Sequence, residues 1–307
     1  MKKLLIFGYS GFVGPYLAKE FADNGYAVYG CDINESLNND KTTFFKCDIL
    51  NFKEVDDVVS RVLPDVIVNL AAISSVGQSW KNPQLTFQVN VSGALNILES
   101  SKKVSKKPKI LFIGSSEEYV SCEYPVSEID QLNANNPYGI SKIAQEQLAA
   151  LYREQYSLNI YCVRSFNHIG VGQRDTFVIP SWCRQVAEIE KGISDSNTVK
   201  VGNINIYRDF TDVRDVVKAY RLIVESNNSA SLYNVGSGNA YLLKDLLSII
   251  VSFSSKRIDV VVESNYLRPN DNGYICCNRS KITNELGWEP KHDIRDTLKE
   301  IYDSFMK

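Results

Sequence analysis

The 307-residue chain is predicted to be an α/β protein, with a doubly wound parallel sheet and a smaller mixed α/β part towards its C-terminal end. Short β-branched runs alternate with helical patterns through the first half, which is the order typical of strand–helix–strand units. The runs are apolar on both faces, as in a parallel sheet that helices cover on each side. Beyond Val163 the alternation loosens into short strands, helices and turns rich in Asn, Ser and Gly.

The elements can be placed in order along the chain. The expected strands of the first half comprise residues 3–7, 27–31, 42–46, 66–70, 109–113 and 159–163, and the helices among them comprise 12–24, 51–61, 83–103 and 137–156. Further helices are expected near 179–191, 213–225, 242–253 and 294–305. This order predicts two interleaved domains, the first of residues 1–165 plus about 209–236 and the second of about 166–208 plus 237–307. Open α/β sheets bind ligands beyond the carboxyl ends of their strands, so functional residues are expected there.

Composition excludes several function classes. The formal net charge of −2 provides no basic field for nucleic acid or an anionic membrane surface, and no apolar run is long enough to span a membrane. Seven cysteines, an odd number scattered through apolar segments, indicate reduced thiols and a cytoplasmic protein. With two histidines and no Cys-x-x-Cys, no metal site is expected.

A glycine motif follows the first expected strand. Gly8, Gly11 and Gly14 form Gly-x-x-Gly-x-x-Gly at the opening of a helix, where backbone N–H groups can approach a pyrophosphate. The second strand ends in Asp32, and an acid there accepts both hydroxyls of an adenosine ribose and repels a 2′-phosphate. Residues 33–36 carry no cation, so a Rossmann-type domain that binds NAD is expected in preference to NADP. The alternative is that the glycines only end a strand and Asp32 is a surface turn residue.

Other cofactor contacts are expected along the same edge of the sheet. Asp48, after the third strand, could hold the adenine amino group, and small residues after the fourth strand would let a dinucleotide lie against the backbone. Both features could equally be ordinary turn and packing chemistry. The remaining residues expected at the cofactor are Phe12, Val13, Ile49, Leu70, Ala71 and Ala72.

A tyrosine and a lysine lie one turn apart at the start of the 137–156 helix. Tyr138 and Lys142 share a helix face, and a lysine cation nearby should favour the phenolate and lower the tyrosine pKa. Ser115, at the tip of the fifth strand, supplies a hydroxyl that can hold the substrate oxygen with which the tyrosine would exchange a proton. This set suits hydride transfer at a carbinol or ketone, with both residues also contacting the nicotinamide cofactor. The separate buried stripe of the helix is expected to comprise Ile140, Ala144, Leu148 and Leu151.

Together these motifs resemble the extended short-chain dehydrogenase/reductase family of nucleotide-sugar enzymes. The likeness covers nearly the whole chain, because the second half carries "RSFNHIGVGQ" (164–173), "YRDFTDVRDVVKAY" (207–220), "YNVGSGN" (233–239), "LRP" (267–269) and "LGWEP" (286–290). Within the family the motifs look most like GDP-4-keto-6-deoxy-mannose reductases and GDP-mannose 4,6-dehydratases. The chain departs from the reductase pattern at Val120, at Val171 and at positions 270–273.

The resemblance implies substrate contacts. Asn167, Arg208 and Arg268 would meet the diphosphate of a sugar nucleotide, and guanidinium groups suit phosphate oxygens. Ser116 and Asn203 complete the expected substrate site. The alternatives are a local ion pair of Arg208 with Asp209 or Asp212, and a solvated loop position for Arg268.

Glu117 leaves the reaction open, because it can be the base of a dehydratase, an acceptor for a sugar hydroxyl or a helper of Tyr119. The first expectation is NAD(H)-dependent reduction of a GDP-4-keto-6-deoxy-hexose at C4. Oxidation at C4 without dehydration comes next, followed by 4,6-dehydration or 4-epimerisation, and a non-catalytic NAD-binding module comes last. The resemblance also implies a homodimer that pairs helices near 83–103 and 137–156, although both could pack only on their own sheet.

Overall fold

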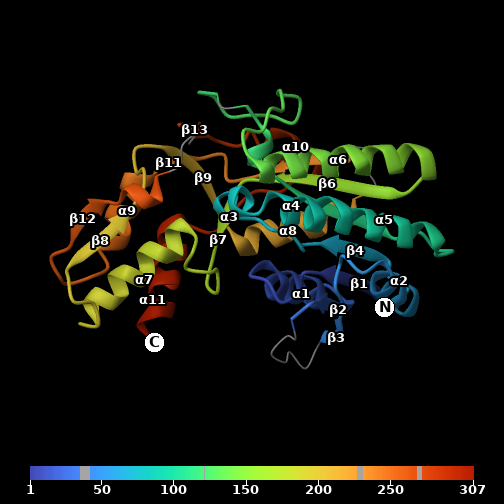
Figure 1. Cartoon of the computed structure of the whole chain (residues 1–307), viewed down its shortest axis with the longest axis horizontal. Coiled ribbons are helices and arrows are strands. Elements are labelled where there is room, and N and C mark those ends of the chain that lie inside the picture. Colours follow the sequence, from blue (N-terminus) through green and yellow to red (C-terminus); the bar gives the residue numbers. More distant parts are fainter. Residues whose placement is uncertain (35–41, 121, 227–230, 268–271) are drawn as a thin grey trace.

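A computed structural model describes residues 1–34, 42–120, 122–226, 231–267 and 272–307. Its larger part is a seven-stranded parallel sheet in the order β10-β6-β5-β4-β1-β2-β3 (Figure 1). The strands are β1 (Lys2–Phe7), β2 (Tyr26–Asp32), β3 (Thr42–Lys46), β4 (Val66–Asn69), β5 (Lys109–Ser115), β6 (Asn159–Ser165) and β10 (Leu232–Val235). The order reverses between β1 and β4, so the predicted doubly wound sheet is confirmed and its switch point lies there.

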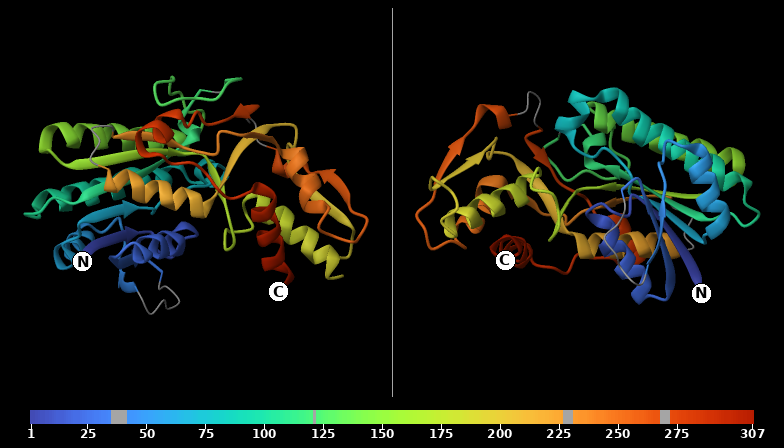
Figure 2. Two further views of the ribbon diagram at one scale, coloured as in Figure 1. Left: turned by 180° about the vertical axis from the view of Figure 1, so that it is seen from behind. Right: turned by 60° about the horizontal axis from the view of Figure 1, so that its bottom comes forward.

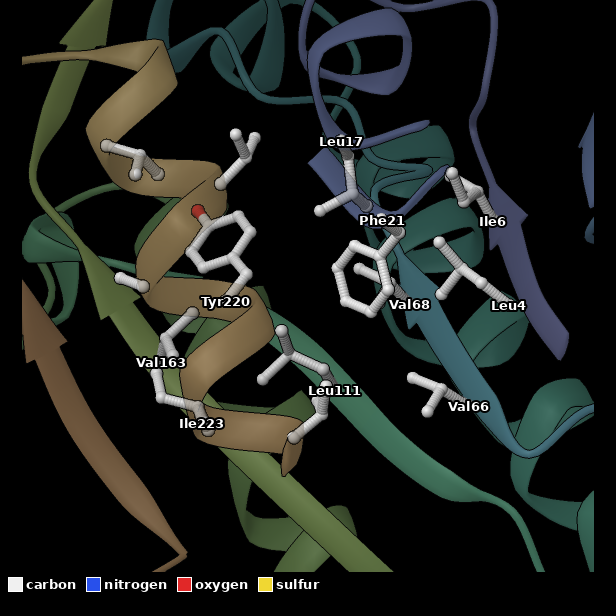
Figure 3. Close-up of a cluster of buried hydrophobic side chains, with 14 of the residues drawn as sticks. Leu4, Ile6, Leu17, Phe21, Val66, Val68, Leu111, Val163, Tyr220 and Ile223 are labelled. Carbon is white, nitrogen blue, oxygen red and sulfur yellow. The ribbon is translucent and has the colours of Figure 1, made fainter. Parts of the chain in front are cut away.

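Helices cover both faces of this sheet because successive side chains of each strand point to opposite sides. Leu4 and Ile6 of β1 enter one core cluster, and Leu5 and Phe7 enter the other. The first cluster lies beneath α1 (Val13–Asp23) and α8 (Val213–Glu225), and Figure 3 shows Phe21 and Tyr220 facing the strand side chains there. The second lies beneath α2 (Phe52–Val62), α5 (Gly93–Lys103) and α6 (Pro137–Tyr156).

The second part is a smaller α/β assembly that the chain enters directly after β6. It contains β7 (Asn167–Ile169), α7 (Val178–Glu190), β8 (Thr198–Val201), β9 (Tyr207–Asp212), β11 (Ala240–Leu242), α9 (Leu243–Val251), β12 (Asp259–Val262), β13 (Tyr274–Ile275) and α11 (Ile294–Met306). Strand β9 pairs with β7, β11 and β13, whereas β8 and β12 form a separate pair. In Figure 2 the helices α7 and α11 stand to one side of the large sheet, around their own core.

Three elements were not expected from the sequence: α3 (Val76–Lys81), α10 (Ser280–Leu286) and a π-helical segment, Gln88–Ser92. The π-helical segment interrupts the helix expected over residues 83–103, between α4 (Pro83–Phe87) and α5. Short 3₁₀ turns at Ser116–Glu118 and Ser264–Tyr266 complete the described elements.

The expected buried stripe of α6 is confirmed only in part. Leu148 is half-buried and packs against the second core cluster, whereas Ile140 and Leu151 are 47% and 50% exposed. The first turns of the helix bury Tyr138 and Lys142 instead. Helical periodicity therefore identified an apolar stripe, but part of that stripe lies on the outside of the helix.

Candidate active site

The glycine motif forms a tight cradle at the switch point of the sheet. Gly8 has a φ of +81°, and a Cβ there would lie 2.5 Å from the backbone nitrogen of Ala71. A Cβ at Gly14 would collide with the carbonyl oxygen of Tyr9. Only glycine allows these backbones to approach so closely, and the N-terminal end of α1 begins at the same place. The cradle is the structure that a dinucleotide pyrophosphate requires, so the residues present fit such a cofactor.

Asp32 lies beside this cradle at the end of β2. Its carboxylate accepts hydrogen bonds from the backbone nitrogens of Ser10, at 3.1 Å, and Asn34, at 3.2 Å. The acid is therefore tied to the glycine loop rather than being an isolated surface residue. Residues 35 and 36, which the sequence analysis used to argue against NADP, lie outside the described residues.

The other expected cofactor residues surround the cradle to different extents. Asp48 is exposed and its carboxylate accepts a hydrogen bond from the Leu50 nitrogen, at 2.9 Å. Ile49 is buried against Gly93. Phe12 and Val13 are half-buried at the start of α1, and Phe12 stacks on the His168 ring. Leu70, Ala71 and Ala72 are half-buried directly after β4.

The structure brings Ser115, Tyr138 and Lys142 together. Ser115 ends β5, and Tyr138 and Lys142 lie on the first turns of α6, which packs against β5. The Ser115 hydroxyl lies close enough to Tyr138 to act on its ionisation, and the Lys142 ammonium lies 5.9 Å from the centroid of the tyrosine ring. Lys142 Nζ donates to the Ile113 carbonyl oxygen at 2.7 Å. All three side chains are buried.

Burial governs the ionisation of this trio. It raises the pKa of Tyr138 well above the ordinary value of 10.0, although the Ser115 hydrogen bond acts in the opposite direction. The expected lowering of the tyrosine pKa is therefore not what this structure shows. Burial also lowers the pKa of Lys142 to about 8, and the nearby Glu118 carboxylate limits that fall.

The capping of α6 connects Glu117 to the same site. Asn136 caps the helix by accepting from the Gly139 nitrogen at 2.9 Å, and its amide donates to Glu117 Oε2, also at 2.9 Å. A Cβ at Gly139 would collide with the Glu117 carbonyl oxygen, so glycine allows the turn after β5 to meet the helix. Glu117 is half-buried and is held near Ser115, whose hydroxyl accepts from its backbone nitrogen at 3.1 Å.

The expected substrate residues lie on the second part and on the turn after β5. Ser116 is buried in that turn. Asn167 donates to the carbonyl oxygen of Asp209 at 3.2 Å, and Asn203 accepts from the Asn205 nitrogen at 3.0 Å. Arg268 and positions 270 and 271 lie outside the described residues.

Arg208 is buried on β9, and its guanidinium donates to the carbonyl oxygens of Tyr207, at 2.8 Å, and Asn272, at 2.6 Å. The two acids considered as local ion-pair partners of Arg208, Asp209 and Asp212, bind other groups. Asp209 accepts from three backbone nitrogens and the Ser237 hydroxyl, and Asp212 pairs with Arg214 at 2.7 Å.

Two residues at the site were missed by the sequence analysis. Asn90, in the π-helical segment, donates to the Ser141 hydroxyl at 2.9 Å and also pairs with the backbone of Ile73. Nothing in the sequence pattern distinguishes it. Glu118 is fully buried beside Ser115, and the doubled glutamate of "SSEEY" was the available signal.

The described residues contain neither a group of metal ligands nor a membrane-spanning helix. No group of three or more His, Cys, Asp or Glu side chains there could hold a metal ion. No helix in the described part of the chain has the length and apolar character needed to cross a membrane.

Comparisons with known proteins agree with this geometry. The sequence profile of the GDP-mannose 4,6 dehydratase family matches residues 5–301. A GDP-6-deoxy-D-mannose reductase from Pseudomonas aeruginosa is 28% identical, over 98% of this chain and 96% of its own. The solved structure of RMD from Pseudomonas aeruginosa, complexed with NADPH, superposes with a TM-score of 0.88 at 28% identity, covering 100% of this chain and 99% of that one. A UDP-glucose 4-epimerase from Brucella ovis, in complex with NAD, shares the fold with a TM-score of 0.88 at 24% identity, covering 100% and 99%.

Proposed function

Because the chain belongs to the GDP-mannose 4,6-dehydratase family, we propose that it is an oxidoreductase that reduces a GDP-4-keto-6-deoxy-hexose at C4. The observation that carries the proposal is the buried group of Ser115, Tyr138 and Lys142, at the edge of the sheet that also carries the glycine cradle. The likeness to a GDP-6-deoxy-D-mannose reductase over 98% of the chain supports the choice of reduction.

The three catalytic side chains would divide the work of proton transfer. A bound nicotinamide dinucleotide would supply the hydride. Tyr138 would donate its proton to the oxygen on C4, and Ser115 would hold that oxygen by a hydrogen bond. The Lys142 ammonium would stabilise the phenolate that forms, because an opposite charge nearby favours the ionised tyrosine. Burial raises the pKa of Tyr138, which keeps its hydroxyl protonated and available as the acid.

For the cofactor, we propose NAD(H) in preference to NADP(H). The Asp32 carboxylate is fixed at the glycine loop, where it would accept the ribose hydroxyls and repel a 2′-phosphate. The similar reductase was solved with NADPH and the similar epimerase with NAD, so relatives of this fold use both.

For the sugar nucleotide, we propose contacts from Ser116, Asn167, Asn203, Arg208 and Arg268. Arg208 supports this because its guanidinium is buried, and a partly desolvated guanidinium binds phosphate oxygens strongly. The proposed division into a cofactor domain and a substrate domain follows from the same assignment, since Asn203 and Arg208 belong to the second part.

One alternative has a specific observation behind it. Glu117 is held at the site by Asn136, and a carboxylate placed there could remove the C5 proton of a 4-keto sugar, which is the step that precedes loss of water from C6. This second candidate is 4,6-dehydration of a GDP-mannose-type sugar. Oxidation at C4 without dehydration, 4-epimerisation and a non-catalytic binding module are the remaining outcomes.

A substrate panel separates these functions. The purified protein would be incubated with GDP-, UDP- and dTDP-sugars, including GDP-4-keto-6-deoxy-mannose, with NAD or NADH, and products identified by mass. Gain of two hydrogens by the keto sugar supports the proposal. Loss of water, loss of two hydrogens or isomerisation without a mass change would overturn it in favour of a dehydratase, dehydrogenase or epimerase. No product from any sugar would favour the binding module.

We further propose a homodimer formed through the outer faces of α4 and α6. Leu85, Phe87, Ile140 and Leu151 are each more than a third exposed on these helices, and such an apolar surface favours association. A reducing compartment such as the cytoplasm is proposed because all seven cysteines are unpaired and six are buried.

A further inference from the structure

A carboxylate that the proposed mechanism does not use lies directly behind the catalytic serine. Glu118 is fully buried, and its Oε1 accepts a hydrogen bond from the Ser115 nitrogen at 2.6 Å. A Cβ at Gly114 would collide with Oε1, so this strand end is shaped around the acid. Among the described residues, Oε2 has no hydrogen-bond donor. Burying a carboxylate with one oxygen that lacks a hydrogen-bond donor costs stability.

The nearest cation does not neutralise Glu118 through a hydrogen bond. Arg164 Nε on β6 lies 3.6 Å from Glu118 Oε2. The guanidinium instead forms a bidentate pair with Glu146, at 3.0 and 2.6 Å, and donates to the Tyr119 hydroxyl at 2.9 Å. Arg164 is thus largely committed to other partners.

The second cation near Glu118 is Lys142. Its ammonium binds the Ile113 carbonyl oxygen, and Glu118 binds the Ser115 nitrogen, so both hold the same three-residue end of β5. The charged and titratable groups that face Glu118 come from two elements. Helix α6 contributes Tyr138, Lys142 and Glu146, and strand β6 contributes Cys162 and Arg164. Lys142 is the cation of this set that also belongs to the catalytic trio.

We propose that Glu118 is a positioning residue: it fixes the backbone of Ser115 and places a buried carboxyl group at the same end of β5 that holds the Lys142 ammonium. The inference rests on the proposed function, in which the Lys142 cation stabilises the phenolate of Tyr138. It gives the second glutamate of "SSEEY" a role distinct from that of Glu117, which meets Asn136 at the helix cap.

The ionisation behaviour of the two groups supports this assignment. Burial lowers the pKa of Lys142, and the Glu118 carboxylate is the strongest influence that raises it. Burial and then Glu146 raise the pKa of Glu118, whereas the Ser115 hydrogen bond, Arg164 and Lys142 lower it. Loss of a proton from Glu118 therefore strengthens the hold of Lys142 on its own proton.

The test is the pH dependence of turnover in Glu118→Gln. Glutamine keeps the shape of the side chain and an acceptor for the Ser115 nitrogen but removes the charge. The Lys142 pKa should fall, so the alkaline limb of kcat/KM should move to lower pH, and each unit of movement costs about tenfold on that limb. At pH values below the start of the alkaline limb, kcat/KM of the variant should stay within about threefold of the wild-type value. A limb that does not move would overturn the proposal.

Glu146→Gln is the matched control, because it makes the same substitution in the same cluster. Glu146 raises the pKa of Glu118, so removing its charge should leave the alkaline limb in place or move it to higher pH. Equal acidward shifts in both variants would indicate a general structural effect and would also overturn the proposal. Thermal unfolding of both variants shows whether each is folded.

A direct titration keeps this inference separate from the proposed function. The side-chain ¹⁵N resonance of Lys142, identified by its absence in Lys142→Met, reports protonation whether or not a sugar is turned over. It should titrate at lower pH in Glu118→Gln than in the wild type. Failure of the sugar panel with a shifted titration would reject the proposed reaction alone, whereas an unshifted titration would reject the role of Glu118.

Discussion

At the residue scale, the candidate site contains a buried phenol. Burial favours the neutral hydroxyl of Tyr138 by raising its pKa, although the Ser115 side chain acts in the opposite direction. The residue types were visible in the sequence, because Tyr138, Lys142 and Ser115 follow from spacing and strand order. The pKa of Tyr138 could not be predicted from the sequence. It is raised because burial removes water from around the hydroxyl, and burial is a property of the packed structure.

Replacing Tyr138 by phenylalanine should therefore remove chemistry and spare binding. We expect kcat/KM to fall about 10²–10⁴-fold, because proton transfer by a positioned side chain contributes that much. Affinity for the dinucleotide should change little, since the ring remains. Absorbance of the reduced nicotinamide measures turnover, and calorimetry measures binding. Turnover equal to that of the wild type would contradict the role of Tyr138.

Asp32 should decide between the two dinucleotides. In Asp32→Ala we expect affinity for NADH to fall about 10- to 150-fold, because hydrogen bonds to a charged acceptor contribute about 1.5–3 kcal/mol. Affinity for NADPH should not fall, because the repulsion of its 2′-phosphate is lost. Dissociation constants measured by fluorescence titration give the ratio. Asp57→Ala, an exposed acid on α2, is the control and should leave the ratio unchanged.

At the element scale, long periodic segments were predicted well and packed faces were not. The limits of α6 and α8 agree with the expectation because their apolar residues repeat with a helical period. The π-helical segment was missed, since one extra residue in a turn leaves no compositional signal. Two members of the expected buried stripe of α6, Ile140 and Leu151, proved to be exposed, because periodicity detects an apolar stripe without identifying its partner.

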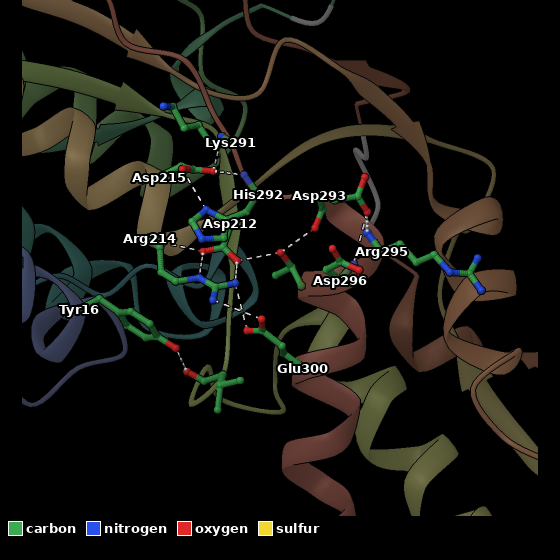
Figure 4. A network of polar contacts seen from close by, with 12 residues as sticks. Tyr16, Asp212, Arg214, Asp215, Lys291, His292, Asp293, Arg295, Asp296 and Glu300 are labelled. Carbon is green, nitrogen blue, oxygen red and sulfur yellow. Dashed lines mark hydrogen bonds and ion pairs between the residues drawn. The ribbon is translucent and has the colours of Figure 1, made fainter.

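The element junction between α8 and α11 provides a test of pH dependence. Asp212 caps α8 and binds Arg214 of the same helix and Thr297 of α11 (Figure 4). Burial opposes ionisation, but the hydrogen bonds from Arg214 and Thr297 outweigh it and hold the pKa of Asp212 below its ordinary value of 3.8. Its stabilising contribution is present above that ordinary pKa and is lost as the pH falls through the lower folded value.

Asp212→Asn should accordingly lower the free energy of unfolding by about 1.5–3 kcal/mol near neutral pH, because charge-assisted hydrogen bonds are lost. The difference from the wild type should begin to shrink below about pH 4 and should vanish below the lowered folded pKa, where the wild-type carboxylate is also neutral. Urea unfolding at several pH values measures both effects. Asp23→Asn, which breaks an exposed pair with Lys19, should change the free energy by less than about 0.5 kcal/mol.

At the scale of the whole molecule, two parts meet where the sheet presents its functional edge. Residues from β1, β2, β5 and α6 lie in the larger part, and Asn203 and Arg208 lie in the smaller one. Alternation of strands and helices was sufficient to predict the larger part. The smaller part is held by pairing of β9 with strands distant in the sequence, which no local pattern encodes. The same limit applies to surfaces that a second copy of the chain would cover.

The proposed dimer provides the prediction at this scale. Ile140 and Leu151 form an apolar stripe on the outer face of α6, away from the buried Tyr138 and Lys142. A lysine at either position would place a charge, and its symmetry mate, in a desolvated interface. We expect Ile140→Lys and Leu151→Lys each to raise the dimer dissociation constant at least about 100-fold, while the monomer stays folded because both side chains already reach solvent. Light scattering during size-exclusion chromatography measures the mass.

Ile193→Lys, at a 66% exposed position after α7, is the control and should leave the assembly unchanged. A wild-type monomer, or a dimer that survives both α6 variants, would show that this face is not the interface.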